Sequence, residues 1–290
     1  MLAITETDTV RAALVAMTAA LDDAGIANAA TDARLLLQGV LGADAAALIR
    51  DPDRVTGAKA PLLLNAVARR VAREPVSRIL GTRAFYGRDF NVTPDVLDPR
   101  ADTETLIEVV LELVRGAGRQ ADPLTIADIG TGSGAIIVTL LAELPNARGI
   151  ATDVSDAALA VARQNAERLG VLGRLTLINT RGLLGVSLSP DFVVSNPPYI
   201  PAGDIAGLDP DVVLYDPHLA LDGGPDGLAI YREIACHISE LESNTQAILE
   251  IGAGQADDVE AIFSAIGARP CQRRRDLGGH VRVVALEIQR

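Results

Sequence analysis

Apolar residues recur at helical spacing through the first 75 residues of the chain. The first stripe, which Gly25 ends as a helix stop, consists of Val10, Ala13, Leu14, Met17 and Leu21. A second stripe covers residues 35–41, with Thr31 and Asp32 as its expected caps and Gly42 as its end. A third covers residues 62–71. Since no β-rich run interrupts these stripes, the pattern predicts a small helical bundle.

The pattern changes near Pro75. Residues 78–93 are rich in aromatic and apolar side chains, with Gly81 and Gly87 between them, which is typical of a β-hairpin. From about residue 120 onward, short apolar runs alternate with amphipathic stretches. We therefore predict a helical domain over residues 1–77, a β-hairpin connector over 78–100 and a larger domain over 101–290.

The larger domain shows the alternation of an α/β protein. The pattern predicts strands at residues 124–129, 148–152, 175–179, 191–195, 247–251 and 281–288, and helices at 135–144, 156–169, 228–241 and 256–266. Regular alternation favours a doubly wound, mostly parallel sheet. A short link joins the last two strands, which allows an antiparallel edge.

Composition narrows the class of protein. The chain has 290 residues, of which 49% are hydrophobic, so it can bury a large core. Its net charge of −12 lowers the expectation that it binds nucleic acid directly through the phosphates. No apolar run reaches the length of a membrane span, and no Cys/His cluster has metal-ligand spacing. We therefore expect no membrane partner and no metal.

The cysteine content bears on the cellular compartment. Two cysteines, Cys236 and Cys271, are too few for a disulfide framework, and residues 1–8 lack the features of a signal peptide. Both observations favour a reducing cytoplasm, in which the two thiols are expected to be buried.

One tetrapeptide carries candidate chemistry. Asn196, Pro197, Pro198 and Tyr199 follow the apolar run at residues 192–195, so they turn the chain at the carboxyl end of a strand. Ligands bind at that edge of open α/β sheets. A side-chain amide and a free carbonyl can both accept hydrogen bonds from a planar NH2 group, and an aromatic ring can cover its face. The motif suits an enzyme that acts on an amide or amino nitrogen; the alternative is an ordinary proline-rich turn.

A glycine-rich turn supplies a second candidate site. It follows the first strand of the larger domain and consists of Gly130, Thr131, Gly132, Ser133 and Gly134. Asp153 ends the next strand, where a carboxylate can accept hydrogen bonds from both hydroxyls of a ribose. The alternative interpretation is that Asp153 only caps the following helix. A glycine turn without a basic residue fits an adenosine ligand that lacks phosphate, and S-adenosylmethionine is such a ligand.

Together these motifs resemble a class I S-adenosylmethionine-dependent methyltransferase, which implies a Rossmann-like, seven-stranded sheet. More narrowly, the chain is similar to the PrmC (HemK-type) release-factor glutamine methyltransferases. The segments that carry this resemblance lie at residues 73–75, 79–81, 85–87, 99–100, 102–104, 196–199, 215–224, 226–228, 250–252 and 276–278. They occur in one order over most of the chain.

The resemblance implies an activity, a partner and a set of site residues. The family methylates the glutamine of the Gly-Gly-Gln loop in peptide-chain release factors, and its helical N-terminal domain helps to hold that protein substrate. The implied cofactor is S-adenosylmethionine, with S-adenosylhomocysteine as product, and its binding residues are Gly130, Thr131, Gly132, Ser133, Gly134, Asp153, Gly182 and Asn196. The implied catalytic residues are Asn196, Pro197 and Tyr199, which bind the substrate together with Pro198.

The chain departs from the family pattern at three places. Ala101 replaces a proline, and Asp98 replaces an apolar residue. After the third strand, where an acidic residue is frequent, residues 179–182 read Asn-Thr-Arg-Gly. We therefore expect Gly182 to meet the cofactor through its backbone alone.

Three other functions remain open. An enzyme that methylates a glutamine in a ribosomal protein shares the tetrapeptide. A DNA adenine or cytosine amino methyltransferase also uses such a motif, but the acidic chain shows no added target-recognition segment. A non-catalytic adenosine-binding module would not need residues 196–199.

Overall fold

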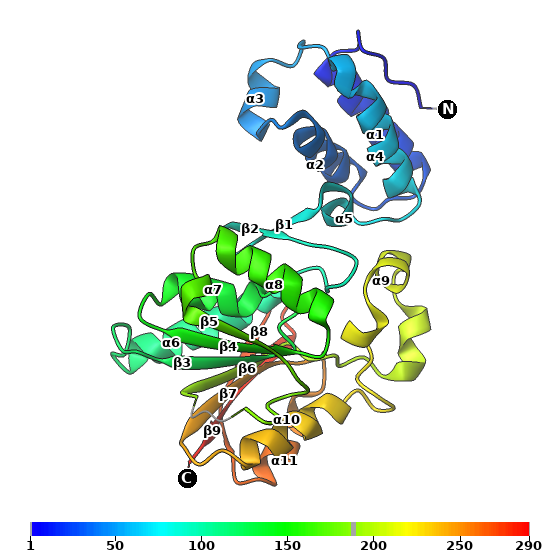
Figure 1. The fold of residues 1–290 in the computed structure, drawn as a ribbon. Coiled ribbons are helices and arrows are strands. Elements are labelled where there is room, and N and C mark those ends of the chain that lie inside the picture. Colours follow the sequence, from blue (N-terminus) through cyan, green and yellow to red (C-terminus); the bar gives the residue numbers. More distant parts are fainter. Residues whose placement is uncertain (1, 187–189, 290) are drawn as a thin grey trace. The chain divides into compact units, whose positions relative to one another are not determined.

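The computed structural model describes residues 2–186 and 190–289. They form two compact units (Figure 1). The first consists of residues up to Thr82 together with Asp209–Tyr215, and the second of Arg83–Leu208 together with the residues from Asp216 onward. No helix among the described residues is long and apolar enough to cross a membrane. The functional domain boundaries at residues 77 and 100 stay a prediction.

The first unit is the expected helical bundle. Its helices are α1 (Val10–Asp23), α2 (Ala29–Leu41), α3 (Ala45–Arg50), α4 (Ala60–Val71), α5 (Val76–Leu80) and the distant α9 (Pro210–Tyr215), with the 3-10 turn η1 (Gly57–Lys59) before α4. Met17, Leu36 and Leu63 are fully buried in its core. Gly42 ends α2 in the left-handed conformation with φ of +63°, as the sequence predicts.

An ion cluster attaches α9 to this bundle. Arg70 is buried at the end of α4, and its guanidinium pairs with Asp32 at 2.7 Å and with Asp211 at 2.8 Å. The hydroxyl of Tyr215 also donates to the carbonyl of Ala72 at 2.8 Å. Burying one arginine between two carboxylates offsets its desolvation, so residues 209–215 belong to the bundle although they lie far from it in sequence.

Some predicted details of the bundle are wrong. The helix cap expected at Thr31 and Asp32 lies inside α2, which begins at Ala29 with Asn28 as its N-cap. The side chain of Asp32 pairs with Arg70 instead of capping the helix. Helices α3 and α5 were missed, because six and five residues are too few to reveal a helical period.

A β-hairpin follows the bundle in sequence. Strands β1 (Thr82–Phe85) and β2 (Arg88–Asn91) form a two-stranded sheet. Tyr86 and Gly87 connect them with φ of +48° and +69°, the positive pair that a tight hairpin turn requires. The rings of Phe85 and Phe90 pack edge to face with centroids 5.9 Å apart.

The second unit contains the seven-stranded, mostly parallel sheet. Its strands are β3 (Thr125–Ile129), β4 (Arg148–Asp153), β5 (Leu175–Asn179), β6 (Phe192–Ser195), β7 (Thr245–Glu250), β8 (Arg269–Arg275) and β9 (Val281–Ile288). Their order across the sheet is β5-β4-β3-β6-β7-β9-β8, and β9 runs antiparallel to both of its neighbours. The expected fold class is confirmed.

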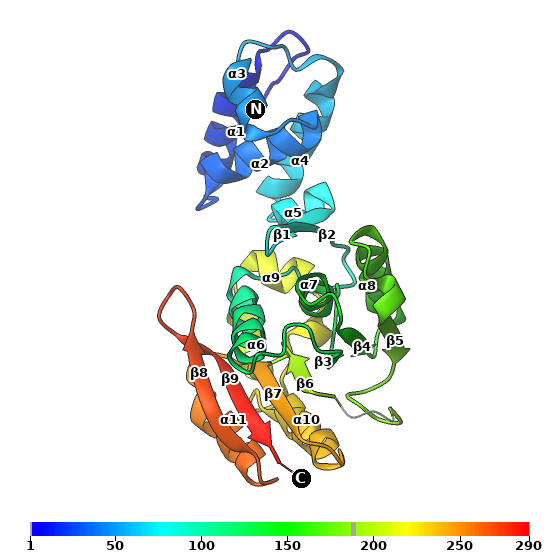
Figure 2. The same cartoon turned by 90° about the vertical axis from the view of Figure 1, so that its left-hand side faces the viewer.

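Consecutive residues of each central strand feed two separate cores. Val194 and Ile248 pack on the face covered by α6 (Glu104–Gly116) and α7 (Ala135–Glu143). Their neighbours Val193 and Leu249 pack on the opposite face. The helices on that face are α10 (Ala229–Ser239) and α11 (Ala256–Ser264), and Figure 2 shows the two layers on either side of the sheet. Side chains alternate along a strand, so a strand between two helix layers must be apolar on both faces.

The predicted helices of this unit agree with α7, α8 (Asp156–Arg168), α10 and α11 to within about three residues at each end. Helix α6 was missed although Glu104, Glu108 and Glu112 recur every four residues between apolar side chains, which is the spacing of an amphipathic helix. Strand β8 was missed as well. It is an edge strand whose residues are mostly exposed and charged, so it lacks an apolar pattern.

The prediction of buried cysteines is wrong. Both thiols are free and exposed. Cys236 lies on the outer side of α10, and Cys271 lies on the edge strand β8. Neither position faces a core, so neither cysteine needs to be apolar for packing.

Candidate active site

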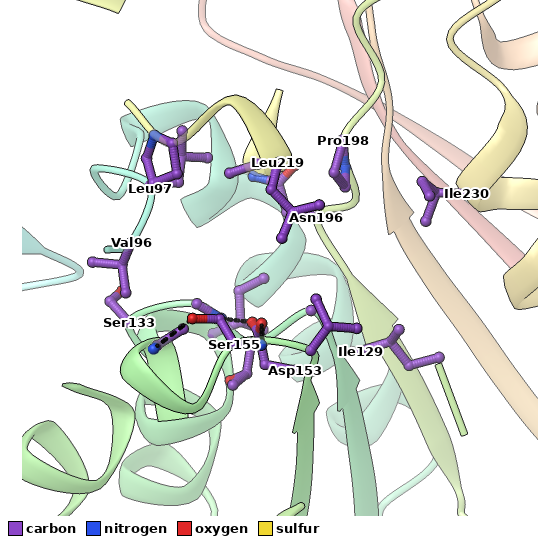
Figure 3. A pocket seen from close by; sticks show the side chains of 18 of the residues that line it. Val96, Leu97, Ile129, Ser133, Asp153, Ser155, Asn196, Pro198, Leu219 and Ile230 are labelled. Carbon is purple, nitrogen blue, oxygen red and sulfur yellow. Dashed lines mark hydrogen bonds between the residues drawn. The ribbon is translucent and has the colours of Figure 1, made fainter. Parts of the chain in front are cut away.

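A cavity of about 230 Å³ opens in the second unit at the carboxyl ends of β3, β4 and β6. In the sheet, β3 lies between β4 on one side and β6 on the other. The strand order therefore reverses at β3, and the cavity lies at this switch point. Of the residues predicted from sequence, those that line the cavity are Gly130, Thr131, Gly132, Ser133, Asp153, Gly182, Asn196 and Pro198. In the view of Figure 3, Asn196 and Pro198 lie across the cavity from Asp153 and Ser155.

The glycine-rich turn connects β3 to α7 with an unusual backbone. Gly130, Gly132 and Gly134 have φ of +69°, +54° and +79°, which other residues rarely adopt. Gly134 does not line the cavity, and a Cβ on it would lie 3.1 Å from the Cβ of Ala162 on α8. Its evident role is to let α7 and α8 approach, and its contact with the cofactor stays a prediction.

Asp153 joins the glycine-rich turn to the end of β4. Its Oδ2 accepts a hydrogen bond from the amide of Gly132 and its Oδ1 accepts one from the amide of Ser155, both at 2.9 Å. The cap of α8 is Ser155, whose hydroxyl oxygen accepts from the amide of Ala158 at 3.1 Å. The alternative interpretation of Asp153 as a helix cap is therefore wrong. Each carboxylate oxygen keeps lone pairs that can face a ligand in the cavity.

Asp128 supports the turn from beneath, a role that the sequence analysis missed. Its side chain is fully buried, and its Oδ2 accepts a hydrogen bond from the hydroxyl of Thr131 at 2.7 Å. The pKa of Asp128 is raised to about 7, chiefly by burial and also by the charge of Asp153, although the hydrogen bond from Thr131 opposes the shift. The Asp128–Thr131 bond thus fixes the turn without exposing a second carboxylate to the cavity.

The tetrapeptide at residues 196–199 turns away from β6 beside the cavity. Ser195 ends β6, and its hydroxyl donates to the carbonyl of Ile129 at 2.7 Å, which joins the ends of β6 and β3. The amide Nδ2 of Asn196 donates to the Oγ1 of Thr103 at 3.2 Å. Pro197 and Tyr199 are not among the residues that line the cavity, and Tyr199 packs beside the core under α10. The predicted contacts of Pro197 and Tyr199 with a substrate stay predictions.

Three glycines hold the tetrapeptide from behind. A Cβ on Gly223 would lie 2.9 Å from the carbonyl oxygen of Pro198, and one on Gly227 would lie 2.5 Å from that of Tyr199. A Cβ on Gly252 would lie 3.2 Å from the Tyr199 ring. A side chain cannot fit at Gly223 or Gly227 without moving the tetrapeptide backbone, and one at Gly252 would press on the Tyr199 ring.

Comparisons with known proteins decide the family. Residues 12–81 match the family model "PrmC N-terminal domain", and residues 106–206 match "Methyltransferase small domain". The release factor glutamine methyltransferase of Cereibacter sphaeroides is 45% identical over 284 residues, which cover 97% of this chain and 98% of that one. The chain belongs to the release factor glutamine methyltransferase family. The enzyme of that name from Caulobacter vibrioides is 43% identical and covers 91% of both chains.

Membership in the release factor glutamine methyltransferase family confirms the resemblance drawn from the sequence motifs. Among solved structures, the catalytic domain of hMettl16 in complex with the MAT2A 3'UTR hairpin 6 is similar, with a TM-score of 0.54 and 16% identity. The match covers 80% of this chain and 81% of that one. At this identity the likeness concerns the fold, which is that of a methyltransferase.

This family member also has cavity residues that the sequence analysis missed. Val96, Leu97, Leu219 and Ile230 add apolar side chains on different sides of the cavity (Figure 3). They come from the connector, from the segment after the tetrapeptide and from the start of α10, and only Leu219 lies in a segment that carries the family resemblance. Among the described residues, no group of three His, Cys, Asp or Glu side chains is arranged to hold a metal ion.

Gly182 and its neighbour Arg181 also line the cavity. The side chain of Arg181 pairs with Glu233 of α10 at 2.7 Å, and both residues line the cavity. Gly182 has φ of +58°, and a Cβ on it would lie 2.1 Å from the Nδ1 of His237. Glu233 thus brings a carboxylate to the cavity, where it is paired with Arg181.

We expect Gly182→Ala to lower the thermal midpoint more than Gly185→Ala. Both glycines have positive φ, at +58° and +72°, but a Cβ on Gly185 meets no atom within 4 Å. The added collision with His237 is expected to cost about 1–3 kcal/mol, the range typical of overpacking. Circular dichroism melting of both variants measures the difference. Adding His237→Ala to Gly182→Ala should remove the extra loss in thermal midpoint. Equal midpoints for Gly182→Ala and Gly185→Ala would contradict the prediction.

Proposed function

We propose that this chain transfers a methyl group from S-adenosylmethionine to the side-chain amide nitrogen (N5) of the glutamine in the Gly-Gly-Gln motif of peptide-chain release factors. The observation that carries the proposal is the position of Asn196. Its side chain lies at the cavity, which the glycine-rich turn and Asp153 also line. The identity of 45% with a release factor glutamine methyltransferase over nearly the whole chain supports the substrate.

The residues of the cavity fit S-adenosylmethionine. Asp153 offers carboxylate oxygens to the hydroxyls of a ribose, and the glycine-rich turn adds no basic residue that would select a phosphate. Val96, Leu97 and Ile129 form apolar surface for a flat base. When bound, this cofactor supplies an electrophilic methyl group on a positively charged sulfur. The reaction leaves S-adenosylhomocysteine.

The tetrapeptide would compensate for the weak nucleophilicity of the substrate amide. The lone pair of a carboxamide nitrogen is delocalised, so the nitrogen is a weak nucleophile. The Oδ1 of Asn196 and the carbonyl of Pro197 would accept hydrogen bonds from its two N–H groups, and the ring of Tyr199 would pack on its plane. These contacts would fix the rotation of the NH2 group, so that catalysis comes from positioning and from acceptors that meet the charge developing on nitrogen.

The partner and the compartment follow from the same proposal. The helical first unit would contribute to holding the release factor, and the enzyme would act in the cytoplasm. The net charge of −12 favours a protein substrate over DNA or RNA, whose phosphates attract basic surfaces.

A methyl-transfer assay tests the proposal. The purified protein is incubated with radiolabelled S-adenosylmethionine and, in separate tubes, a release factor, its Gln→Ala loop variant, ribosomal proteins and duplex DNA. We expect label on the release factor and none on the loop variant. Label on ribosomal protein or DNA alone would keep the chemistry but reject the substrate, and no label in any tube would reject the activity.

A further inference from the structure

A buried polar chain extends from Asn196 through Thr103, which also lines the cavity, to Glu250, which does not. Thr103 accepts the hydrogen bond from the Nδ2 of Asn196, and only 4% of its surface is exposed. Behind Thr103 lies Glu250, which is 1% exposed. Ser195 and Leu249 are register partners in β6 and β7, so Asn196 and Glu250 each follow directly at the same edge of the sheet.

The buried carboxyl of Glu250 interacts with two side chains near the site, those of Thr103 and Tyr199. The pKa of Glu250 is raised to about 7, chiefly by burial, although its interactions with Thr103 and Tyr199 oppose the shift. The charge of Arg282 on β9 also lowers this pKa, and that of Asp102 raises it. Among the described residues, the Oε2 of Glu250 has no hydrogen-bond partner. A buried carboxyl with so few partners costs stability, so a role beyond packing is worth seeking.

The proton count of Thr103 determines how Asn196 is oriented. A threonine hydroxyl has one proton to donate. When that proton goes to Glu250, the Oγ1 of Thr103 can only accept, so it must face the NH2 group of Asn196. The Oδ1 of Asn196 is then left for the cavity side. A threonine without an acceptor behind it could donate to Oδ1 instead and turn the carboxamide round.

We propose that Glu250 and Thr103 are positioning residues that hold the carboxamide of Asn196 with its oxygen toward the substrate, while Glu250 also holds the hydroxyl of Tyr199. The inference rests on the proposed function, because an NH2 substrate needs an acceptor at Asn196. One buried carboxyl thereby orients two members of the tetrapeptide from behind, without entering the cavity itself.

Three threonine variants test the kinetic consequence with a release factor as substrate. Thr103→Val keeps the shape but removes the hydroxyl, so kcat is expected to fall about 10- to 100-fold, the range expected when a reacting group is misplaced. Thr103→Ser restores the hydroxyl and should stay within about threefold of the wild type. Thr139→Val is the matched control, because Thr139 is also buried but its hydroxyl has no partner among the described residues. The Kd of S-adenosylmethionine should change less than about threefold in all three.

Two further comparisons distinguish a positioning role from a general loss of structure. Glu250→Leu removes the acceptor and should match Thr103→Val, whereas Glu250→Gln keeps an acceptor oxygen and should lose less. In the Asn196→Ala background, Thr103→Val should lower kcat by less than about a further threefold, because the effect of Thr103 on kcat acts through Asn196. A full multiplicative loss in the double variant, or a kcat of Thr103→Val within threefold of the wild type, would overturn the inference.

A second readout needs no substrate. In ¹⁵N-labelled protein, the side-chain NH2 signals of Asn196, identified by their loss in Asn196→Asp, should exchange slowly with solvent. Thr103→Val should speed this exchange at least about tenfold, and Thr103→Ser should not. If the wild-type protein transferred no label to a release factor, the proposed function would fail. The hydrogen-exchange measurement would still show whether Thr103 holds the carboxamide of Asn196. Unchanged exchange in Thr103→Val would reject the role of Thr103.

Discussion

Asn196→Ala is expected to lower the turnover of release-factor methylation about 100- to 1000-fold, the usual loss when one preorganised polar group at a reacting centre is removed. The substituted side chain lies at the cavity beside the end of β6 and is held by Thr103. Its loss removes one acceptor for the substrate NH2 group and leaves the glycine-rich turn unchanged. Single-turnover assays at saturating cofactor measure the effect, and calorimetry measures cofactor binding.

Asn146→Ala is the matched control for this experiment. Asn146 is exposed, and its Nδ2 donates to the carbonyl of Ala121 at 2.8 Å, away from the cavity. The control should retain wild-type turnover. If Asn196→Ala lost less than about threefold while the fold and cofactor binding stayed intact, Asn196 would have no catalytic role.

Asp153→Asn is expected to weaken binding of S-adenosylmethionine about 10- to 100-fold. An amide presents one acceptor oxygen where the carboxylate presents two, and a hydrogen bond to a charged group contributes about 1.5–3 kcal/mol. The same substitution leaves either Gly132 or Ser155 without its acceptor, so the turn is loosened as well. Titration calorimetry gives the dissociation constant directly.

Asp156→Asn makes the same chemical change three residues later. Asp156 begins α8, lies outside the residues that line the cavity, and accepts a hydrogen bond from Asn179 at 2.6 Å. Its Kd should stay within about twofold of the wild-type value. Equal weakening in both variants would show that the charge near α8, and not a specific contact of Asp153, determines cofactor affinity.

Sequence patterns predicted the fold where apolar periodicity reports burial. Strand β9 was predicted with its observed bounds, and α7 and α8 to within one residue, because both faces of this sheet are covered by helices. The edge strand β8 has no buried face to reveal. Helix α6 does carry a helical pattern, with glutamates every four residues from Glu104 to Glu112, and its omission was an error of interpretation. Apolar periodicity in the sequence therefore predicts the central strands of the sheet better than its edge strand.

The candidate site was predictable where backbone chemistry constrains the residue type. The positive φ values at Gly130 and Gly132 require glycine, and the prolines at 197 and 198 require a turn. The apolar side chains of Val96 and Leu219 come from loops, in which any apolar residue fits the same space. Thr103 and Glu250 are brought together by tertiary structure alone, 147 positions apart (250 − 103).

The attachment of α9 has a consequence for how this protein could be divided or recombined. Because residues 209–215 belong to the helical unit, the chain passes between the units three times, after Thr82, Leu208 and Tyr215. A fragment that ends at Thr82 would leave the buried guanidinium of Arg70 without Asp211, one of its two carboxylates. A chimera of two family members that exchanged only the first 82 residues would pair one parent's Arg70 with the other parent's α9. The two stretches of the helical unit, residues up to Thr82 and residues 209–215, must therefore be exchanged together. Substitutions in one stretch should be accompanied by compensating substitutions in the other.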